Sequence, residues 1–580
     1  MDKIAKLKEF WKISQNEWND WVIRAEKAFK FYRGEQWESD VKAELKKQGR
    51  PALTFNKIKP IIRNLSGWQR QNRQDQRVLP RKGGSKQLAD LFTELLKYFY
   101  DASNANWKIS QIFMDGLICG KGWLALDVDY EKDPLTGELL LTRENPLLVF
   151  EDPYSQRYDL SDAKYIIRCA WYDKDEIIAK FPKVKKEFPA GLATIDTKER
   201  QRYSDIEKYR YLVKEIWWRE WVEKKLVINI NTFEVKEVNE PDEKIEALVS
   251  QYPFLKAVKR VIPILNLTTM VGDIVLQDIK DPFRGISLFP LVRFVADFVN
   301  ADKPYVKGEV DDLIDPQMEI NKRRSQALHI INTSANSGWE FDEDTFVGLS
   351  QERAKLEKMG STPGITVMKR KGTYLKRITP MPLPDALITL DRLADDDIKK
   401  ISGVNPDLLG FKEEAGTSGI LANLRKQQGL ITCEPLFDNF EWTQKILGET
   451  LLEFIRKTDI LSDEEIANIV DAQRYSIELL KSRKVGKYEV VLTTSPSSPT
   501  TRIMNFTMLM ELVKMGFPVP PKLLLTYSDI PGKEEMLAEL EQQQGGKQPP
   551  MSQEAVLPSQ SLPIEELPPE IMGVNYEPAT

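Results

Sequence analysis

Two aspartates at alternate positions are the residues that most resemble a catalytic pair. Asp127 and Asp129 stand two residues apart in the segment GWLALDVDY. In a β-strand such side chains point to the same face, so their carboxylates could share a divalent metal ion, as two-metal nucleases require. Alternation also puts polar residues on the solvent-facing side of an ordinary strand. The pattern favours the solvated face, and it keeps a metal-dependent nuclease as the alternative from the enzyme class.

Other residues with catalytic potential do not form a motif. The one histidine, His329, lies in a predicted helix, which argues against histidine-based acid–base chemistry and classical zinc sites. The segment GLICGKG has three residues between its first two glycines, one fewer than a phosphate loop, and lacks a Ser or Thr after Lys121. Ser418 is followed directly by Gly419, unlike the nucleophile of a GxSxG motif. We therefore expect no catalytic residue, no metal ligand and no cofactor.

A compact basic cluster lies in the segment KRKGTYLKR. It comprises Lys369, Arg370, Lys371, Lys376 and Arg377, with an aromatic residue between them. Cations interleaved with an aromatic side chain are typical of nucleic-acid contacts, and a solvated hairpin explains the pattern equally well.

A second basic stretch runs from residue 49 to residue 78 and carries seven Lys or Arg against one acid. After Asn56, a favourable N-cap, apolar residues fall on one side of a predicted helix. The basic residues gather on its flank, and they are Lys59, Arg63, Arg70, Arg73 and Arg77. Charge alone suggests a grip on nucleic acid. A charged helix face is more commonly solvated or ion-paired, so we interpret this flank as a protein–protein contact, to the same or a neighbouring subunit.

Composition sets limits on the whole chain. Its 580 residues contain 83 Lys or Arg and 88 Asp or Glu, a net charge of −5. This balance disfavours a protein that neutralises DNA phosphates over its whole surface, so any contact with nucleic acid must be local. The hydrophobic share of 41% is enough for several cores.

Cys119, Cys169 and Cys433 lie far apart and lack CxxC spacing. We expect them to be buried thiols in a reducing compartment. No apolar run approaches the length of a membrane span, and the first residues are too charged for a signal peptide. We therefore expect a protein made in the cytoplasm, without a membrane partner.

The elements that would position these residues form an α+β pattern. Residues 16–32 have an aromatic helical stripe that ends at Gly34, and helices are also predicted at 91–100 and 107–117. From there to about residue 295 strands dominate, including YIIRCAWY, KEIWWREWV and ISLFPLVRF.

The pattern changes after residue 304. A long helix is predicted over 311–335, followed by a short, turn-rich and mainly β insertion at 336–384. A second helix then carries an apolar stripe from Leu387 to Ile401 and stops at Gly403. Helix, small domain and helix in this order indicate a stalk with a head.

The C-terminal third is predicted to begin with a loop at 405–420. A long helix follows, with kinks at Gly429 and Pro435, and then the strand KYEVVLTT and two helices. From Gly545 onward the chain is rich in proline and poor in apolar residues, so we expect the tail to be disordered.

This order of segments resembles that of tailed-bacteriophage portal proteins of the P22-like family. The residues that carry the likeness are FYRGEQW (31–37), GRPALTFNKIKPIIRNLSGWQRQNR (49–73), DPQMEINKRRSQALH (315–329), SGILANLRKQQG (418–429) and SPSSPTTR (495–502). None of them is a chemical signature, but their order is specific. They span most of residues 30–545.

The resemblance implies a domain division. Residues 1–304 and 419–500 would form the wing, 305–335 and 385–402 the two stem helices, 336–384 the clip, 403–418 the tunnel loop and 501–545 the crown, with a tail at 546–580. Within the tunnel loop, Phe411, Lys412, Glu413 and Glu414 would lie near DNA. One cation beside two acids cannot hold phosphate tightly, which suits a channel through which DNA must slide.

The resemblance also implies partners. Members form a ring of twelve subunits at one capsid vertex, assembled in the host cytoplasm, and they hydrolyse nothing. Their channel passes double-stranded DNA during packaging by the large subunit of terminase and during ejection. The clip, here with the basic cluster at 369–377, would meet the motor and later the head–tail adaptors, while the wing and stem would face the major capsid protein and scaffold. Another virion connector or head-completion protein is the alternative from the class of interaction proteins.

Overall fold

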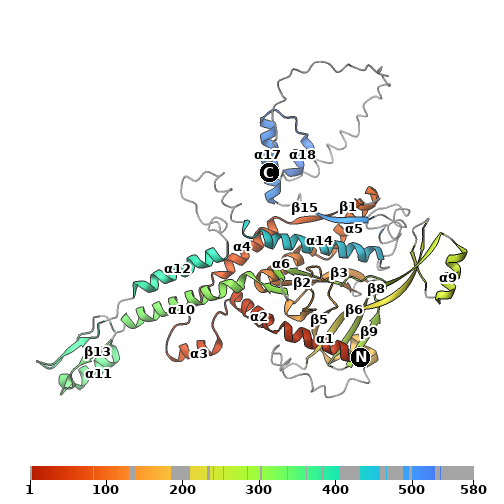
Figure 1. Cartoon of the computed structure of the whole chain (residues 1–580). Coiled ribbons are helices and arrows are strands. Elements are labelled where there is room, and N and C mark those ends of the chain that lie inside the picture. Colours follow the sequence, from red (N-terminus) through yellow and green to blue (C-terminus); the bar gives the residue numbers. More distant parts are fainter. Residues whose placement is uncertain are drawn as a thin grey trace, which may run out of the picture. The chain divides into compact units, whose positions relative to one another are not determined.

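The structure is a computed structural model of the chain, and two compact units make it up, residues 1–498 and 499–580. It describes residues 3–81, 84–129, 137–184, 210–230, 235–238, 241–252, 254–272, 274–283, 285–300, 304–335, 338–360, 362, 364–379, 384–403, 431–457, 466, 487–494, 499–528 and 536. The first unit is a mixed α+β assembly (Figure 1).

Helix α6 (Ala105–Cys119) is central to the first unit. It contacts α2 (Asn19–Arg33), α4 (Ile58–Gln71), α5 (Lys86–Ala102) and α10 (Glu309–Ala335). Its apolar residues are buried on several sides because a helix surrounded by neighbours has no solvent-facing stripe. The helices predicted at 16–32, 91–100 and 107–117 are thus confirmed as α2, α5 and α6, with α5 beginning earlier than expected.

Helix α2 shows how the aromatic stripe is used. Trp21, Val22 and Ala25 are buried, and α2 ends at Gly34, whose φ of 98° lies in the left-handed region that glycine tolerates. Helix α1 (Lys3–Glu17) precedes it.

The strands form antiparallel sheets. The largest has the order β4 (Val149–Glu151), β5 (Tyr165–Asp173), β6 (Arg210–Asn229), β8 (Leu255–Val271) and β9 (Ile274–Lys280), with β7 (Val235–Glu237) paired to β6. A second sheet has the order β10 (Leu291–Val295), β2 (Lys121–Asp129) and β3 (Glu138–Glu144). Short helices α7 (Lys174–Lys180) and α9 (Asp242–Gln251) accompany the large sheet, and β11 (Asp297–Asn300) pairs with β12 (Pro304–Lys307). The predicted strands in this region are confirmed, although ISLFPLVRF is a strand only from Leu291 onward, in β10.

Two later segments return to the N-terminal part of the chain. Helix α14 (Glu434–Lys457) packs on β10, and β15 (Lys487–Thr494) pairs with β1 (Gln74–Arg81). The sequence predicted one long helix with kinks at Gly429 and Pro435, whereas α14 begins only at Glu434. Pro435 lies in the first turn of α14, where its missing N–H costs nothing, and Gly429 lies outside the described residues.

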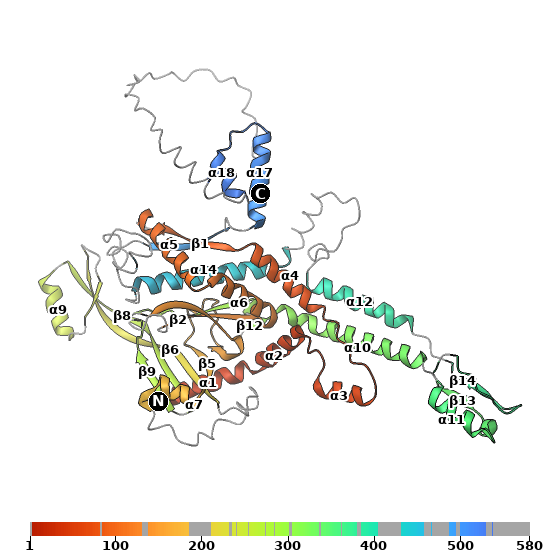
Figure 2. The ribbon, with the colours of Figure 1, turned by 180° about the vertical axis from the view of Figure 1, so that it is seen from behind.

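Helices α10 and α12 (Asp385–Ile401) pack along one another and form a stalk, which is visible in both views (Figures 1 and 2). This confirms the two predicted helices, including the stop at Gly403, whose φ is 64°. Ala394 and Ile398 of α12 are buried, whereas Leu390 and Ile401 of the same predicted stripe are exposed.

A small distal domain joins the two stalk helices. It contains β13 (Trp339–Phe341), the 3-10 turn η3 (Glu343–Phe346), α11 (Ser350–Met359) and β14 (Leu375–Arg377), with β13 and β14 paired. The prediction of a mainly β insertion was wrong in its content, because α11 has ten residues and each strand has three. The charged sequence SQERAKLEKM lacks a wide apolar stripe, so periodicity did not reveal this helix.

The second unit contains α17 (Pro499–Lys514) and α18 (Pro521–Tyr527). The second of the two helices predicted after KYEVVLTT, at 533–543, lies outside the described residues except for Met536, and the tail from 545 onward lies outside them entirely. Among the helices that the structure describes, none is long and apolar enough to cross a membrane.

Candidate functional site

The distal domain gathers the basic cluster on its surface. Lys369, Arg370 and Lys371 lie in the turn before β14, and Lys376 and Arg377 lie on β14 itself, all exposed. A small core holds this turn: Thr345 and Leu356 are buried, and the hydroxyl of Thr345 donates to the carbonyl of Tyr374 at 2.9 Å. The cations are therefore presented by an ordered support.

The same domain has acidic residues at the start of η3. The carboxylate of Asp342 accepts a hydrogen bond from the backbone N–H of Tyr374 at 2.7 Å.

Met368 and Tyr374 expose 65% and 44% of their surface beside the cations. Exposed apolar side chains beside a group of cations are typical of a protein-binding surface. A partner can bury the apolar side chains and pair its acidic residues with the cations.

The basic residues of the 49–78 stretch divide between two elements. Lys59, Arg63 and Arg70 lie on α4, but α4 ends at Gln71, so the prediction that Arg73 and Arg77 continue the helix was wrong. Asn72 hydrogen-bonds back to the carbonyl of Trp68, and Arg77 lies on β1, paired with Val491 of β15. Pairing with a distant strand overrides the local helical pattern, a contact that periodicity does not reveal.

Exposed cations nevertheless line this face. Arg63, Arg70 and Arg77 are exposed, and no ion pair to a described residue is present for them. Arg73 is close to Arg70, and burial together with that neighbouring charge lowers the pKa of Arg73. A cationic surface of this kind favours an acidic partner.

The expected tunnel-loop residues Phe411, Lys412, Glu413 and Glu414 lie outside the described residues.

Asp127 is described, and its carboxylate accepts hydrogen bonds from both terminal nitrogens of Arg168, at 2.6 and 3.0 Å. Thr142 donates to it as well. A carboxylate held by arginine in this way is a structural ion pair rather than a metal ligand, and no described group of three His, Cys, Asp or Glu could hold a metal ion.

A buried charge cluster lies beneath the N-terminal helices. Lys121, Glu151 and Arg293 are each almost inaccessible, with the Lys121 ammonium 2.6 Å and the Arg293 guanidinium 3.3 Å from the same carboxylate oxygen of Glu151. The second oxygen of that carboxylate has no partner among the described residues. Burial lowers the pKa of Lys121 to about 8, although Glu151 opposes the shift.

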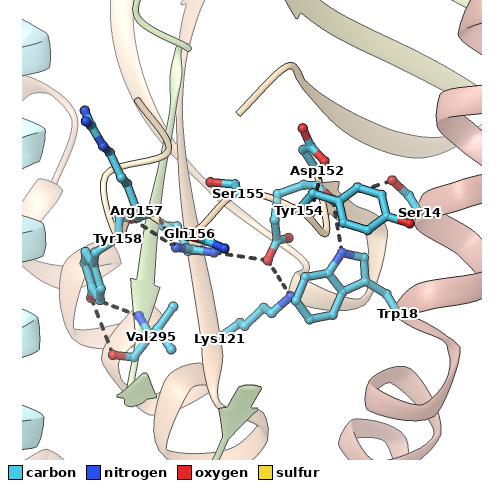
Figure 3. Close-up of polar contacts among 12 residues, drawn as sticks. Ser14, Trp18, Lys121, Asp152, Tyr154, Ser155, Gln156, Arg157, Tyr158 and Val295 are labelled. Carbon is cyan, nitrogen blue, oxygen red and sulfur yellow. Dashed lines mark hydrogen bonds and ion pairs between the residues drawn. The ribbon is translucent and has the colours of Figure 1, made fainter. Parts of the chain in front are cut away.

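Aromatic rings and backbone groups complete this cluster. The Lys121 ammonium lies 3.1 Å from the ring centre of Trp18 (Figure 3). It lies 4.3 Å from the ring centre of Trp21. The indole N–H of Trp18 donates to the carbonyl of Glu151 at 3.0 Å. Arg293 donates to the carbonyls of Arg157 and Tyr158. The cluster thus joins α2, β2, β4 and β10. Its role is to hold these elements together and not to catalyse a reaction.

A ladder of polar side chains on α10 binds an extended segment. Gln317, Asn321 and Ser325 are all buried and follow one another at intervals of four residues. The Gln317 oxygen accepts from Lys57 N at 2.8 Å, the Asn321 oxygen from Phe55 N at 2.9 Å and the Ser325 oxygen from Leu53 N at 2.9 Å.

The spacing of the ladder follows from geometry. Four helical residues advance about 6 Å and two extended residues advance about 6.6 Å, so every fourth side chain of α10 meets every second N–H of the segment. Gln317 also donates to the carbonyl of Phe55 at 2.7 Å. Three N–H groups and one carbonyl of residues 53–57, a segment that belongs to no sheet, thereby find their partners on a helix.

The base of the stalk is closely packed and acidic. A Cβ on Gly308 would lie 2.7 Å from the carbonyl of Ile118, so only glycine fits where the chain enters α10. Glu309, the first residue of α10, is partly buried, and this burial together with Asp297 and Asp312 raises its pKa to about 7.

We expect replacement of Glu309 by glutamine to flatten the pH dependence of stability. Because the pKa of Glu309 is raised in the folded state, that state binds the proton more tightly, and its stability falls as pH rises through about 4.5 to 7. Above pH 7 the variant should be more stable than the wild type by up to about 3 kcal/mol, with no gain below pH 5. Urea unfolding at several pH values measures this. Asp315→Asn, at an exposed position of the same helix, is the control, and a gain that is equal at every pH would contradict the assignment.

Sequence reasoning missed both buried sites. The three members of the ladder have a visible signal, polar residues at helical spacing within DPQMEINKRRSQALH, but polar residues on a helix are ordinarily solvated. Lys121, Glu151 and Arg293 lie in separate strands far apart in the chain, so no local pattern could connect them.

These features define a class of protein. The described residues have an α+β body, a two-helix stalk and a distal domain with a charged and apolar face, and their buried polar groups fix elements in place. This is the organisation of an assembly protein. A family model described as "Phage P22-like portal protein" matches residues 8–570, so the chain belongs to the P22-like phage portal protein family, which is structural and not enzymatic. No curated protein sequence gives a significant match.

Proposed function

We propose that twelve copies of this chain form a ring at one vertex of the phage capsid. The ring is the channel through which terminase packages double-stranded DNA and through which the genome later leaves. It is also the platform for the head–tail adaptors. The observation that carries this proposal is the family match over residues 8–570, joined to a two-helix stalk with an ordered domain at its far end.

Each part of the chain then takes a role. Residues 1–304 and 419–500 form the wing, α10 and α12 supply the stem at 305–335 and 385–402, and residues 336–384 form the clip. Residues 403–418 form the tunnel loop and 501–545 the crown. The outer wing and stem face the major capsid protein and scaffold, and the assembled ring belongs to the virion.

The charge of the chain supports a conducting role. A channel that binds DNA through many cations would hold it, because each phosphate contact adds to affinity. The net charge of −5 avoids this over most of the surface. The exposed cations Arg63, Arg70 and Arg77, with the half-buried Lys59 and Arg73 beside them, then serve contacts between wings of neighbouring subunits, where acidic side chains can pair with them.

Imaging of the purified full-length chain by electron microscopy tests the proposal. Closed rings of uniform subunit number are expected. A chain that stays monomeric at all ionic strengths would overturn the ring. Mg²⁺-dependent cleavage of DNA that is lost in Asp127→Ala would favour the nuclease instead.

Removing the charges of the clip turn should weaken its docking. We expect the triple substitution Lys369→Ala, Arg370→Ala and Lys371→Ala to reduce affinity for terminase or an adaptor about tenfold, because three exposed charge pairs contribute roughly 0.2–1 kcal/mol each. The affinity is measured by surface plasmon resonance on intact rings.

Lys358→Ala is the matched control, since Lys358 is an exposed cation of α11 outside the turn. Rings should form in both variants. Loss of ring assembly in the triple variant, or equal weakening by the control, would contradict the assignment of this surface.

A further inference from the structure

An arm of the chain stands away from the body of the first unit. It comprises residues 38–52 and includes helix α3 (Ser39–Lys47), in which no residue is buried. Both views show α3 beside α10 and apart from the other helices (Figures 1 and 2).

The two ends of the arm are fixed firmly. The indole N–H of Trp37 donates to the carbonyl of Leu53 at 2.9 Å, which closes the arm at its root. Gln36 accepts from Asn321 at 2.6 Å, and Leu53 is bound by the ladder on α10. The chain therefore uses one buried and two partly buried hydrogen bonds to hold the ends of an arm whose helix has no buried residue.

A helix as short as α3 needs a packing surface. Isolated helices shorter than about 12 residues are marginal in water, and α3 has nine. Val41 and Leu45 are four residues apart and form an apolar stripe, with Val41 41% exposed. Lys42 and Lys46 follow one side of this stripe, and Asp40 and Glu44 follow the other.

A groove on the stalk has the complementary pattern. It has a volume of about 460 Å³ and lies on α10, with Leu387 of α12 at its edge. Met318 and Leu387 supply apolar surface, Asp315 and Glu319 lie toward the start of α10, and Lys322 and Arg323 lie one turn further along. Arg323 forms an ion pair with Glu319, but its Nε is shielded from solvent and has no partner among the described residues.

We propose that α3 of one subunit docks in this stalk groove of a second copy of the chain. Val41 and Leu45 cover Met318 and Leu387. Lys42 and Lys46 face Asp315 and Glu319, and Asp40 and Glu44 face Lys322 and Arg323. On its own chain, Asp40 and Val41 line an open cleft with Met318 and Lys322, and still no residue of α3 is buried. The occupant is therefore a second copy, whose arm carries charges opposite to those of the groove.

The contact has the symmetry that a ring needs. The arm and the groove are different surfaces, so the contact is heterologous, and each subunit that offers an arm to the next leaves a groove for the previous one. Repetition closes when the last arm meets the first groove. This inference rests on the proposed ring function and adds the residues that join neighbouring subunits.

A charge exchange tests the contact. In the arm variant, Lys42→Glu and Lys46→Glu should raise the concentration for half-maximal ring assembly at least tenfold, measured by analytical ultracentrifugation and imaging. The groove variant, Asp315→Lys and Glu319→Lys, should do the same. Combining all four substitutions should restore assembly to within a few fold of wild type, because the attraction is re-formed with its signs reversed.

Two controls separate the possible results. Lys86→Glu with Lys97→Glu makes the same charge change on exposed positions of α5, and it should leave assembly unchanged. Unfolding midpoints should match wild type in the arm variant, since α3 has no buried residue. Rings that form normally in the arm variant, or an equal defect in the α5 control, would overturn the docking while leaving the ring intact. Absence of rings in the wild type would overturn the proposed function itself.

Discussion

Replacement of Glu151 by alanine should destabilise the larger unit by about 3–5 kcal/mol, the range observed when one partner of a buried ion pair is removed. Glu151 is the anion between two cations, Lys121 and Arg293, and all three side chains are about 1% exposed. Its loss leaves two like charges in a site without water to screen them. Urea unfolding followed by tryptophan fluorescence measures the effect, because Trp18 and Trp21 lie against Lys121.

The pH dependence distinguishes a charge effect from a cavity. The pKa of Lys121 is already lowered to about 8 while Glu151 attracts its proton, so it should fall further in Glu151→Ala. Between that lower value and the unfolded-state pKa of about 10.4, the unfolded chain binds more protons, and stability rises with pH. The deficit of the variant relative to wild type should therefore shrink as pH rises from 6 toward 9.

A second substitution gives the matched control. Lys121→Met in the Glu151→Ala background removes one of the two uncompensated cations, so the double variant should be more stable than Glu151→Ala alone. Arg293 keeps its hydrogen bonds to the carbonyls of Arg157 and Tyr158. A deficit that is independent of pH, together with a double variant that is less stable than Glu151→Ala alone, would show that packing and not charge governs this site.

The buried charges of Lys121, Glu151 and Arg293 cost free energy of desolvation, and the cluster has a structural role that accounts for them. Helix α2 donates the indole N–H groups of Trp18 and Trp21 to the carbonyls of Glu151 and Cys119, and the ammonium of Lys121 lies against both rings. Charges and hydrogen bonds restrict the orientation of the helix more than apolar contact does, because their geometry is directional. The N-terminal helices are therefore held in one position on the sheets. In the ring that we propose, such a fixed body lets each subunit match its neighbours on both sides.

Periodicity was sufficient for elements that bury one continuous face. The aromatic stripe of α2 and the length of α10 each follow from residues close in sequence, and each was predicted. Strand β2 was also predicted, although its first six residues are buried on both faces and show no alternation of burial. Cys119, Cys169 and Cys433 are buried free thiols, as the absence of paired spacing indicated. The spacing of apolar residues is informative in these cases because it determines which face of a single helix or strand is buried.

Predictions were wrong where a distant partner decided the structure. Arg77 continues the helical spacing of α4, but its backbone pairs with Val491 across the β1–β15 ladder. Helix α11 has little apolar stripe because the core of the distal domain is small, with Phe346 and Leu356 as its main apolar members. The ladder on α10 looked like an ordinary polar face, since nothing local shows that residues 53–57 would run along it.

The ladder therefore allows a second strong prediction. Asn321→Ala should destabilise the larger unit by about 2–4 kcal/mol, because one substitution leaves several buried groups without partners, at about 1–3 kcal/mol each. The backbone N–H of Phe55 loses its acceptor at 2.9 Å and Gln36 loses its donor at 2.6 Å. Thermal or urea unfolding reports the change in stability.

Ser325→Ala is the matched control, because it removes one hydrogen bond of the same ladder, to Leu53 N, and should cost about 1 kcal/mol. The two variants also differ in what they release. Asn321 joins the root of the arm at Gln36 to the extended segment at Phe55, so its loss frees both sides of the arm, whereas Ser325 holds one side. Limited proteolysis should cut within residues 38–52 several times faster in Asn321→Ala than in Ser325→Ala. Equal cleavage rates would mean that Trp37 alone closes the arm, and the ladder would then serve the stalk and not the arm.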